Sequence, residues 1–327
     1  MKAKLNQRVI ILGAAGFIGF HLSKALANVY SCNLVLVDNF IRGENDNPFK
    51  VLTKLENVTF LNLDLTHQLS FANLFHENDI VVNCAAFNGT QNFYSLPTDV
   101  IRNSAIPSIL APECAAKSKV AKYIYLGSAE SYAGSINLGL ATLPTPENVP
   151  LVIEDPSNIR WSYAASKTIG EVAAIANQHS FGLDIKILRV HNIYGPRMGI
   201  NHVVPDLVEK FSNGCFDVFG VNESRAFMYV DDLISILLNF IFDTRFDENL
   251  IYHIGSSHET TIHDLALLIL RCLKIDGVVN PVGNLKGSVQ RRIPDTTLLK
   301  ARMDFSETSL IDGINKYINW YKKVQSN

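Results

Sequence analysis

A tyrosine and a lysine four residues apart, Tyr163 and Lys167, have the spacing in this sequence that points most directly to acid–base chemistry. In a helix, residues at i and i+4 lie on one face, one turn apart. An ammonium group beside a phenol favours the phenolate, which lowers the phenol pKa and makes it a usable base near neutral pH. A tyrosine and a lysine at this spacing are common by chance, so the pair is evidence for a catalytic site only together with the motifs that precede it.

Ser128 and Glu130 follow a predicted strand at 122–127. Ligands of open α/β sheets bind at the carboxyl ends of the strands, and alternate residues beyond a strand end can face one ligand. We therefore expect both side chains at the reacting end of a substrate. A carboxylate partly buried there would have a raised pKa and could abstract a proton. The alternative interpretation of Glu130 is a capping or loop residue.

Three glycines near the start of the chain, Gly13, Gly16 and Gly19, follow an apolar run that predicts a buried strand. Glycine permits a tight turn and a close approach of the backbone to a pyrophosphate, which then lies on the N-terminus of the next helix. Phe17 and Ile18, inside this turn, are assigned to the same cofactor site. The competing interpretation is an ordinary tight strand-to-helix turn.

Residues at the ends of the following strands complete the predicted cofactor site. Asp38 lies about 20 residues beyond the glycines, where a carboxylate accepts hydrogen bonds from the adenosine ribose. It would repel a 2′-phosphate, so NAD is expected rather than NADP; otherwise Asp38 and Asn39 only begin a turn. Asp64 and Leu65 are expected to meet the adenine ring, and Ala85 to pack closely beside the cofactor.

Strands that alternate with helices predict an α/β fold with a parallel, doubly wound sheet of the Rossmann type. The predicted strands are 8–12, 34–37, 58–63, 79–86 and 122–127. A helix expected at 99–117 contains Pro107 and Pro112. Each proline removes a backbone hydrogen bond, so we expect this helix to be bent or broken.

The length of 327 residues predicts two lobes around a cleft. We expect residues 1–190 to bind NAD and residues 191–327 to form mostly a smaller C-terminal α/β substrate-binding lobe, with 227–242 returning to the first domain. Hydrophobic residues make up 47% of the chain, which is enough for a sizeable core.

Charge and cysteine content exclude several classes of partner. The formal net charge is −2 and no basic run is present, so nothing indicates binding to nucleic acid or to a membrane surface. The five cysteines are widely spaced without a C-x-x-C pattern, so we expect thiols in a reducing compartment, the cytoplasm, and no metal site. The first strand begins too early for a signal peptide, and the longest apolar run, 233–242, is too short to span a bilayer.

With these motifs in this order, the chain resembles the extended short-chain dehydrogenase/reductase family, in particular its NAD-dependent nucleotide-sugar epimerases and dehydratases. The resemblance covers nearly the whole chain. It includes LRVHNIYGPR at 188–197, SRAFMYVDD at 224–232 and QRRIPD at 290–295.

The resemblance implies a role for each catalytic residue. Tyr163 would take the proton from the sugar hydroxyl at C4 while hydride passes to NAD. Lys167 would bind the nicotinamide ribose and tune Tyr163, and Ser128 would hydrogen-bond the reacting oxygen. The family usually forms homodimers through the helix that begins at Tyr163 and the helix before the fifth strand. The prolines of the latter make the dimer less secure here.

The resemblance also implies a substrate site for a nucleotide-diphosphate sugar. Asn192, Arg225 and one of Arg291 or Arg292 match positions that hold the diphosphate, where guanidinium geometry suits phosphate oxygens. The alternative for these arginines is surface ion pairing. Asn88 is expected to face the sugar. His202 lies where some relatives place a second acid or base, although a lone loop histidine is more often structural.

Departures from the family pattern leave the reaction open. Glu130 occupies the position of an acid/base glutamate in the dehydratases and decarboxylases, but Ala129 replaces the acid that precedes it in many 4,6-dehydratases. The expected function is an NAD-dependent epimerase or dehydratase that oxidises C4 and passes through a 4-keto intermediate. The alternatives are a UDP-glucuronate decarboxylase, an NDP-sugar 4,6-dehydratase, a GDP-sugar 3,5-epimerase, a 4-dehydrogenase, or a catalytically silent NAD-binding sensor.

Overall fold

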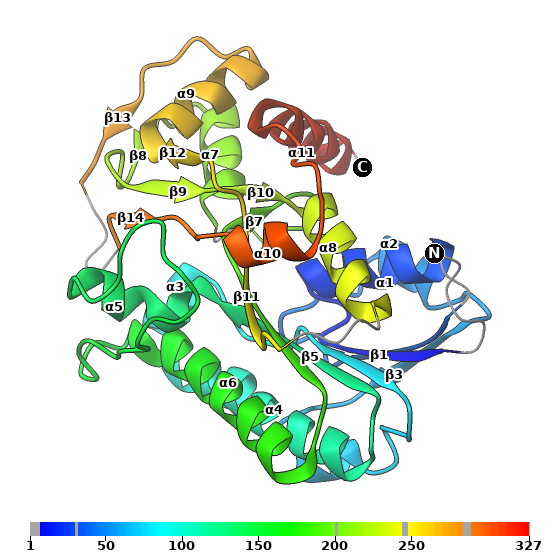
Figure 1. Cartoon of the computed structure of the whole chain (residues 1–327). Coiled ribbons are helices and arrows are strands. Elements are labelled where there is room, and N and C mark those ends of the chain that lie inside the picture. The colour runs from blue at the N-terminus through cyan, green and yellow to red at the C-terminus, as the bar shows by residue number, and fades with distance from the viewer. Residues whose placement is uncertain (1–6, 30–31, 200–201, 244–247, 284–288, 327) are drawn as a thin grey trace.

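A parallel sheet of seven strands lies at the centre of the protein (Figure 1). The computed structural model describes residues 7–29, 32–199, 202–243, 248–283 and 289–326. The strand order within this part of the chain is β11-β6-β5-β4-β1-β2-β3, and every neighbouring pair is parallel. The strands are β1 (Arg8–Leu12), β2 (Asn33–Asp38), β3 (Val58–Asn62), β4 (Ile80–Asn83), β5 (Lys122–Ser128), β6 (Ile185–Val190) and β11 (Ile251–Ile254). The predicted Rossmann-type sheet is confirmed.

Alternate side chains of the central strand β1 face two different hydrophobic cores. Val9 and Ile11 belong to a core shared with α1 and α8, whereas Ile10 and Leu12 belong to a core shared with α4 and α6. Side chains alternate along a strand, so a strand that is apolar at every position needs cover on both faces. The helices of this half are α1 (Phe17–Val29), α2 (Asn47–Leu52), α3 (Thr90–Ser95), α4 (Pro97–Lys117), α5 (Ala133–Asn137), α6 (Trp161–Phe181) and α8 (Val230–Phe242).

Helix α4 runs without interruption through both of its internal prolines. Pro107 and Pro112 are both buried, and the contact of α4 with α6 is the most extensive between any two described elements. The net value of a backbone hydrogen bond is only about 1 kcal/mol, so packing of this extent outweighs the two that are missing. The prediction of a broken helix is therefore wrong, and the alternative of a bent helix stays a prediction.

The second lobe is built from chain that leaves the sheet after β6. Its strand β9 (Ser224–Ala226) pairs antiparallel with β12 (Glu259–Thr261) and parallel with β14 (Arg291–Arg292). Its other elements are β7 (Ile193–Tyr194), α7 (Val203–Ser212), β8 (Asp217–Val218), β10 (Met228–Tyr229), α9 (Ile262–Leu273), β13 (Asn280–Pro281), α10 (Thr297–Arg302) and α11 (Leu310–Gln325).

The chain returns twice from the second lobe to the first. Helix α8 packs against α1, and β11 then joins the central sheet beside β6. The sequence patterns did not indicate the return at β11. The functional division at residue 190 stays a prediction. Among the described helices, none combines the length and the apolar character that crossing a membrane requires.

Candidate active site

The turn between β1 and α1 opens into a cavity at the carboxyl edge of the sheet. The strand order reverses between β1 and β4, and open α/β sheets bind their ligands at such a point. Seven of the residues predicted for the cofactor line this cavity: Gly13, Gly16, Asp38, Asn39, Asp64, Leu65 and Ala85. Arg42, Gly43, Thr66, Cys84 and Asn103 also line it, and the sequence patterns did not indicate them.

The glycine turn accepts no larger residue at two of its positions. Gly13 has φ +76°, and a Cβ there would lie 2.8 Å from the backbone of Ala85. A Cβ on Gly19 would lie 2.1 Å from the carbonyl oxygen of Gly13. Phe17 and Ile18 form the first turn of α1, where backbone N–H groups lack helical partners and bind anions. These residues therefore suit a pyrophosphate.

Asp38 is buried at the end of β2 and holds the glycine turn. The backbone N–H groups of Ala15 and Phe40 donate to its carboxylate at 2.9 and 2.7 Å. Burial raises the Asp38 pKa, and these donors act in the opposite direction. A fixed carboxylate that lines the cavity suits a hydroxyl donor such as a ribose and opposes an additional phosphate.

Tyr163 lies buried beside the end of β5. The side chains of Ser128 and Asn88 lie close enough to act on the pKa of its phenol, so the structure brings together these three predicted residues. Burial, followed by the negative charge of Glu130, raises the Tyr163 pKa, and the nearby side chains of Ser128 and Asn88 only partly oppose this. The predicted lowering of the Tyr163 pKa is therefore wrong in this structure.

The position of Lys167 explains why it does not lower that pKa here. Its Nζ donates to the carbonyl oxygen of Leu126 at 2.7 Å and lies 5.8 Å from the centre of the Tyr163 ring. Burial lowers the pKa of Lys167 itself to about 8. The backbone of β5 thus holds the Lys167 ammonium group near the Tyr163 ring. The two residues lie one helical turn apart on α6, as predicted.

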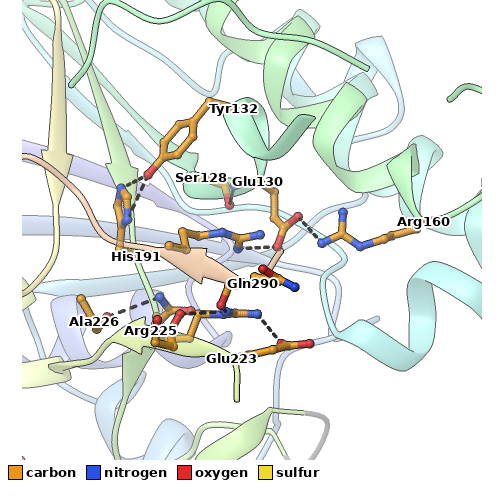
Figure 2. A network of polar contacts seen from close by, with 12 residues as sticks. Ser128, Glu130, Tyr132, Arg160, His191, Glu223, Arg225, Ala226 and Gln290 are labelled. Atoms are coloured by element: carbon orange, nitrogen blue, oxygen red, sulfur yellow. Dashed lines mark hydrogen bonds and ion pairs between the residues drawn. The ribbon is translucent and has the colours of Figure 1, made fainter. Parts of the chain in front are cut away.

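Two arginines from distant parts of the chain bind the Glu130 carboxylate. Nη1 of Arg292 lies 2.6 Å from Oε1 and Nη2 of Arg160 lies 3.2 Å from Oε2. Figure 2 shows Glu130 pointing toward Arg160, away from Tyr132 on the same turn. Burial acts to raise the Glu130 pKa, but the positive charges of Arg292 and Arg160 outweigh it and bring the pKa to about 2. The predicted raised pKa is wrong, because the sequence did not show these partners.

Arg160 is the main residue of the candidate site that the sequence patterns did not indicate. It is buried at the start of α6, one helical turn before Tyr163. Arg160 and Tyr163 are three residues apart, and this spacing places two helical side chains on one face. The spacing could therefore have identified Arg160 from the sequence. Its Nη1 and the Nε of Arg292 are buried and have no hydrogen-bond partner in the described part of the chain.

The two arginines predicted on β14 have different environments, because neighbouring residues of a strand point to opposite faces. Arg292 is buried at Glu130, whereas Arg291 is exposed and pairs with Glu259 at 2.8 Å. The structure thus places Arg291 on the surface and away from the predicted diphosphate site. Arg225 lies close to Arg292 and pairs with Glu223 at 2.8 Å (Figure 2).

Asn192 and His202 lie at the edge of the second lobe. The Asn192 side chain donates to the carbonyl oxygen of Ala226 at 3.3 Å, next to Arg225. Burial, with a smaller contribution from the charge of Arg42, lowers the His202 pKa to about 4. His202 is therefore neutral at pH 7 and cannot donate a proton as an imidazolium there.

A buried polar network holds helix α6 against the sheet. Arg189 of β6 pairs with Glu171 of α6 at 2.8 Å, one turn beyond Lys167. Nη1 of Arg189 lies 3.4 Å from Nε2 of His253, whose ring stacks on Tyr132. These contacts connect the helix that carries Tyr163 to the turn that carries Glu130.

Comparison with known protein families identifies the architecture. The model of the NAD-dependent epimerase/dehydratase family matches residues 9–255, which is most of the chain. The chain belongs to this family. Membership confirms the predicted resemblance to extended short-chain dehydrogenases/reductases, the enzyme class and NAD as the cofactor.

Relatives within the family catalyse different reactions. The chain is 27% identical to UDP-N-acetyl-alpha-D-glucosaminuronate decarboxylase of Bacillus cytotoxicus, over 98% of this chain and 100% of that protein. It is 25% identical to dTDP-glucose 4,6-dehydratase of Streptomyces niveus, over 96% and 93%. The fold matches a variant of UDP-glucuronic acid 4-epimerase of Bacillus cereus, bound to a fluorinated substrate analogue and NAD, with a TM-score of 0.86, 20% identity and coverage of 97% and 100%.

Proposed function

We propose that the protein oxidises C4 of a nucleotide-diphosphate sugar that carries a carboxylate at C6, and then releases this carboxylate as CO2. The observation that carries the proposal is the buried cluster of Glu130, Arg160 and Arg292. The relatives include a decarboxylase of such a sugar acid, which supports this choice.

The first step is proton removal from the C4 hydroxyl. Tyr163 is the base, and Ser128 and Asn88, which lie beside its phenol, orient the two oxygens. Bound NAD would supply the hydride acceptor for C4 and a positively charged ring that favours the Tyr163 phenolate. Lys167, fixed by the Leu126 carbonyl, is positioned to bind the nicotinamide ribose.

Glu130 is a poor base for the alternative reaction, which is elimination of water. Dehydration after C4 oxidation begins with abstraction of the C5 proton, and a base for this task needs a pKa near the working pH. The carboxylate of Glu130 has a pKa of about 2 because two arginines bind it. We assign it to positioning Arg160 and Arg292 instead.

The charge of this cluster fits an acidic sugar. Arg160 and Arg292 carry two positive charges and Glu130 one negative charge, so one positive charge remains for a ligand. The two arginines also keep buried nitrogens without a partner in the described residues, and an unpaired buried donor costs about 1–3 kcal/mol. A substrate carboxylate supplies both the charge and the acceptor oxygens. Arg225, which pairs with Glu223 beside them, is left to meet the diphosphate.

Decarboxylation needs no base at C5. Oxidation at C4 creates a β-keto acid, in which the C5–C6 bond breaks and its electron pair moves through C5 to the C4 oxygen. CO2 leaves, and a proton is added at C5. Hydrogen bonds from Ser128 and from the protonated phenol of Tyr163 would stabilise the negative charge on the C4 oxygen.

The test is incubation of the purified protein with NAD and a panel of UDP-glucuronate, UDP-N-acetylglucosaminuronate, UDP-glucose and dTDP-glucose. Mass spectrometry and NMR identify the products. We expect loss of CO2 from an acidic sugar, and no CO2 release by a Tyr163→Phe variant that still binds NAD. Loss of water from a neutral hexose, or an acidic sugar altered only in its ring stereochemistry, would refute the proposal in favour of a dehydratase or an epimerase.

We also propose that the protein is a cytoplasmic homodimer. Helices α4 and α6 carry exposed apolar side chains, which are Ile101, Ile109, Ile169, Val172 and Ile175. These two helices pack side by side, so a second copy could cover them as a four-helix bundle. The five cysteines are free thiols, which supports a reducing compartment.

A further inference from the structure

His253 of β11 is a fully buried histidine that packs against the turn after β5. Its ring stacks on the ring of Tyr132, with 5.1 Å between the two centres and 26° between the two planes. Tyr132 ends the short turn that follows Ser128, and Glu130 lies in the same turn. His253 therefore contacts the segment that presents the Glu130 carboxylate to the two arginines.

The hydrogen bonds of His253 determine which of its ring nitrogens carries the proton. A guanidinium has donors only, so Nε2 of His253, 3.4 Å from Nη1 of Arg189, is the acceptor. Nδ1 then carries the hydrogen and donates to the carbonyl oxygen of Thr145 at 3.0 Å. Burial, followed by the positive charge of Arg189, lowers the His253 pKa to about 3, so the ring is neutral at pH 7.

Segment 145–147 connects this histidine to the chain that carries Arg292. The carbonyl oxygen of Thr145, which accepts from the histidine ring, also accepts from the N–H group of Asp295 at 2.8 Å. The N–H group of Thr145 donates to the carbonyl oxygen of Ile293 at 2.9 Å. The three residues that follow Arg292 are thereby tied to a carbonyl group that the histidine holds.

The other end of segment 145–147 is fixed to the central sheet. The carboxylate of Glu147 accepts from the backbone N–H group of His253 at 3.0 Å. The carbonyl oxygen of Glu147 accepts from Nη1 of Arg189, on β6, at 2.8 Å. The segment therefore cannot shift without breaking bonds to two strands of the sheet.

We propose that His253 is a positioning residue that fixes Arg292 relative to Glu130, so that the arginine pair accepts the carboxylate of an acidic nucleotide sugar. Stacking on Tyr132 places the turn of Glu130, and the bond from Nδ1 to Thr145 places the chain of Arg292. A charged hydrogen bond spans about 2.7–2.9 Å, so a displacement of about 1 Å between the two segments would remove it. This inference rests on the proposed function, because it takes the arginines as the groups that bind the carboxylate.

The experiment measures the binding of UDP-glucuronate and UDP-glucose to the NAD-loaded protein by isothermal titration calorimetry. Every protein also carries Tyr163→Phe, which stops the reaction so that only binding is measured. His253→Phe keeps a ring to stack on Tyr132 and removes the hydrogen bond to Thr145. We expect it to weaken UDP-glucuronate binding by about 10- to 100-fold, the range for a lost hydrogen bond to a charged group, and to change UDP-glucose binding little.

His253→Asn tests the hydrogen bond separately from the stacking. An asparagine amide places a donor near the position of Nδ1, so the bond to the Thr145 carbonyl is kept while the ring is lost. Its affinity for UDP-glucuronate should lie between those of the parent and His253→Phe. His21→Phe is the matched control, because Nε2 of His21 also bonds a backbone carbonyl, that of Pro196 at 2.8 Å, but on α1. It should leave the ratio of the two affinities unchanged.

Melting temperatures show which variants are folded, and His253→Asn carries the test if His253→Phe is not. The inference is overturned if His253→Phe keeps the parent ratio of the two affinities, if it weakens both nucleotide sugars equally, or if His253→Asn binds UDP-glucuronate no better than His253→Phe. A parent protein that binds UDP-glucuronate no more tightly than UDP-glucose is a separate result. It would refute the carboxylate site, and with it the proposed function, before any His253 variant is compared.

Discussion

Replacing Glu130 with glutamine is expected to lower the free energy of unfolding by about 3 kcal/mol at pH 7. The Glu130 pKa is about 2 in the folded protein and about 4.5 without its partners. Each pKa unit corresponds to about 1.4 kcal/mol, so the folded state favours the ionised side chain by about 3 kcal/mol. Glutamine is neutral and leaves Arg160 and Arg292 without their shared carboxylate, which is the situation that destabilises buried ion pairs most.

The contribution of the Glu130 carboxylate to the free energy of unfolding should depend on pH. A carboxyl group with a depressed pKa stabilises the fold above about pH 4.5, and this contribution is lost as the pH falls toward 2. The difference between the parent and Glu130→Gln should therefore narrow from about 3 kcal/mol at pH 7 to about 2 kcal/mol at pH 3.5. Urea denaturation at fixed NAD concentration, repeated across this range, measures it.

Glu259→Gln is the matched control. Glu259 also has a pKa of about 2, through its pair with Arg291, but that pair is exposed on the surface. Surface ion pairs contribute about 0–1 kcal/mol, so this variant should change stability by less than 1 kcal/mol. The reasoning is refuted if Glu130→Gln costs no more than Glu259→Gln at pH 7, or if its cost is the same at pH 7 and pH 3.5.

Three further predictions follow from burial and packing. Lys167→Met should raise the free energy of unfolding at pH 7 by about 1–3 kcal/mol, because burial lowers the Lys167 pKa to about 8. This gain in stability should disappear as the pH rises from 8 to 10.5, and urea denaturation at these two pH values measures it. Gly19→Ala would place a Cβ 2.1 Å from the Gly13 carbonyl oxygen, and it should lower the melting temperature and abolish NAD binding. Gly16→Ala would place a Cβ 3.3 Å from the same oxygen and should lower the melting temperature less. Equal melting temperatures of the two variants would contradict this prediction. Val172→Glu on the exposed face of α6 should convert a dimer to a monomer in sedimentation velocity runs, while Val51→Glu on α2 should leave the mass unchanged.

The cofactor half was predictable because its signals are local. The strand β1, the glycine turn and the first turn of α1 occupy residues 8–20, and the steric need for glycine at Gly13 and Gly19 is set within that turn and by its neighbour Ala85. Apolar runs without helical period predicted the parallel strands, since strands covered on both faces show that pattern. Neither prediction required information on contacts between segments that are distant in the sequence.

The pKa values of the site residues were not predictable, because they depend on contacts between residues that are far apart in the sequence. Glu130 receives Arg160 from 30 residues away and Arg292 from 162 residues away, and these partners reverse the direction of its pKa. Which of Arg291 and Arg292 points toward Glu130 depends on the pairing of β14 with β9, which no local pattern shows. The continuity of α4 through its prolines was missed for the same reason, since the burial of this helix against the rest of the chain is not a local pattern.

The return of β11 to the central sheet affects how the protein is made in a cell. Strand β6 ends at Val190, but its outer neighbour in the sheet consists of residues Ile251–Ile254. During synthesis, the first 190 residues emerge well before the strand that covers this edge, and an uncovered parallel edge can pair with other chains. We infer that the nascent chain passes through an aggregation-prone stage until residue 254 has left the ribosome, and that a fragment ending at residue 190 would expose the same edge permanently.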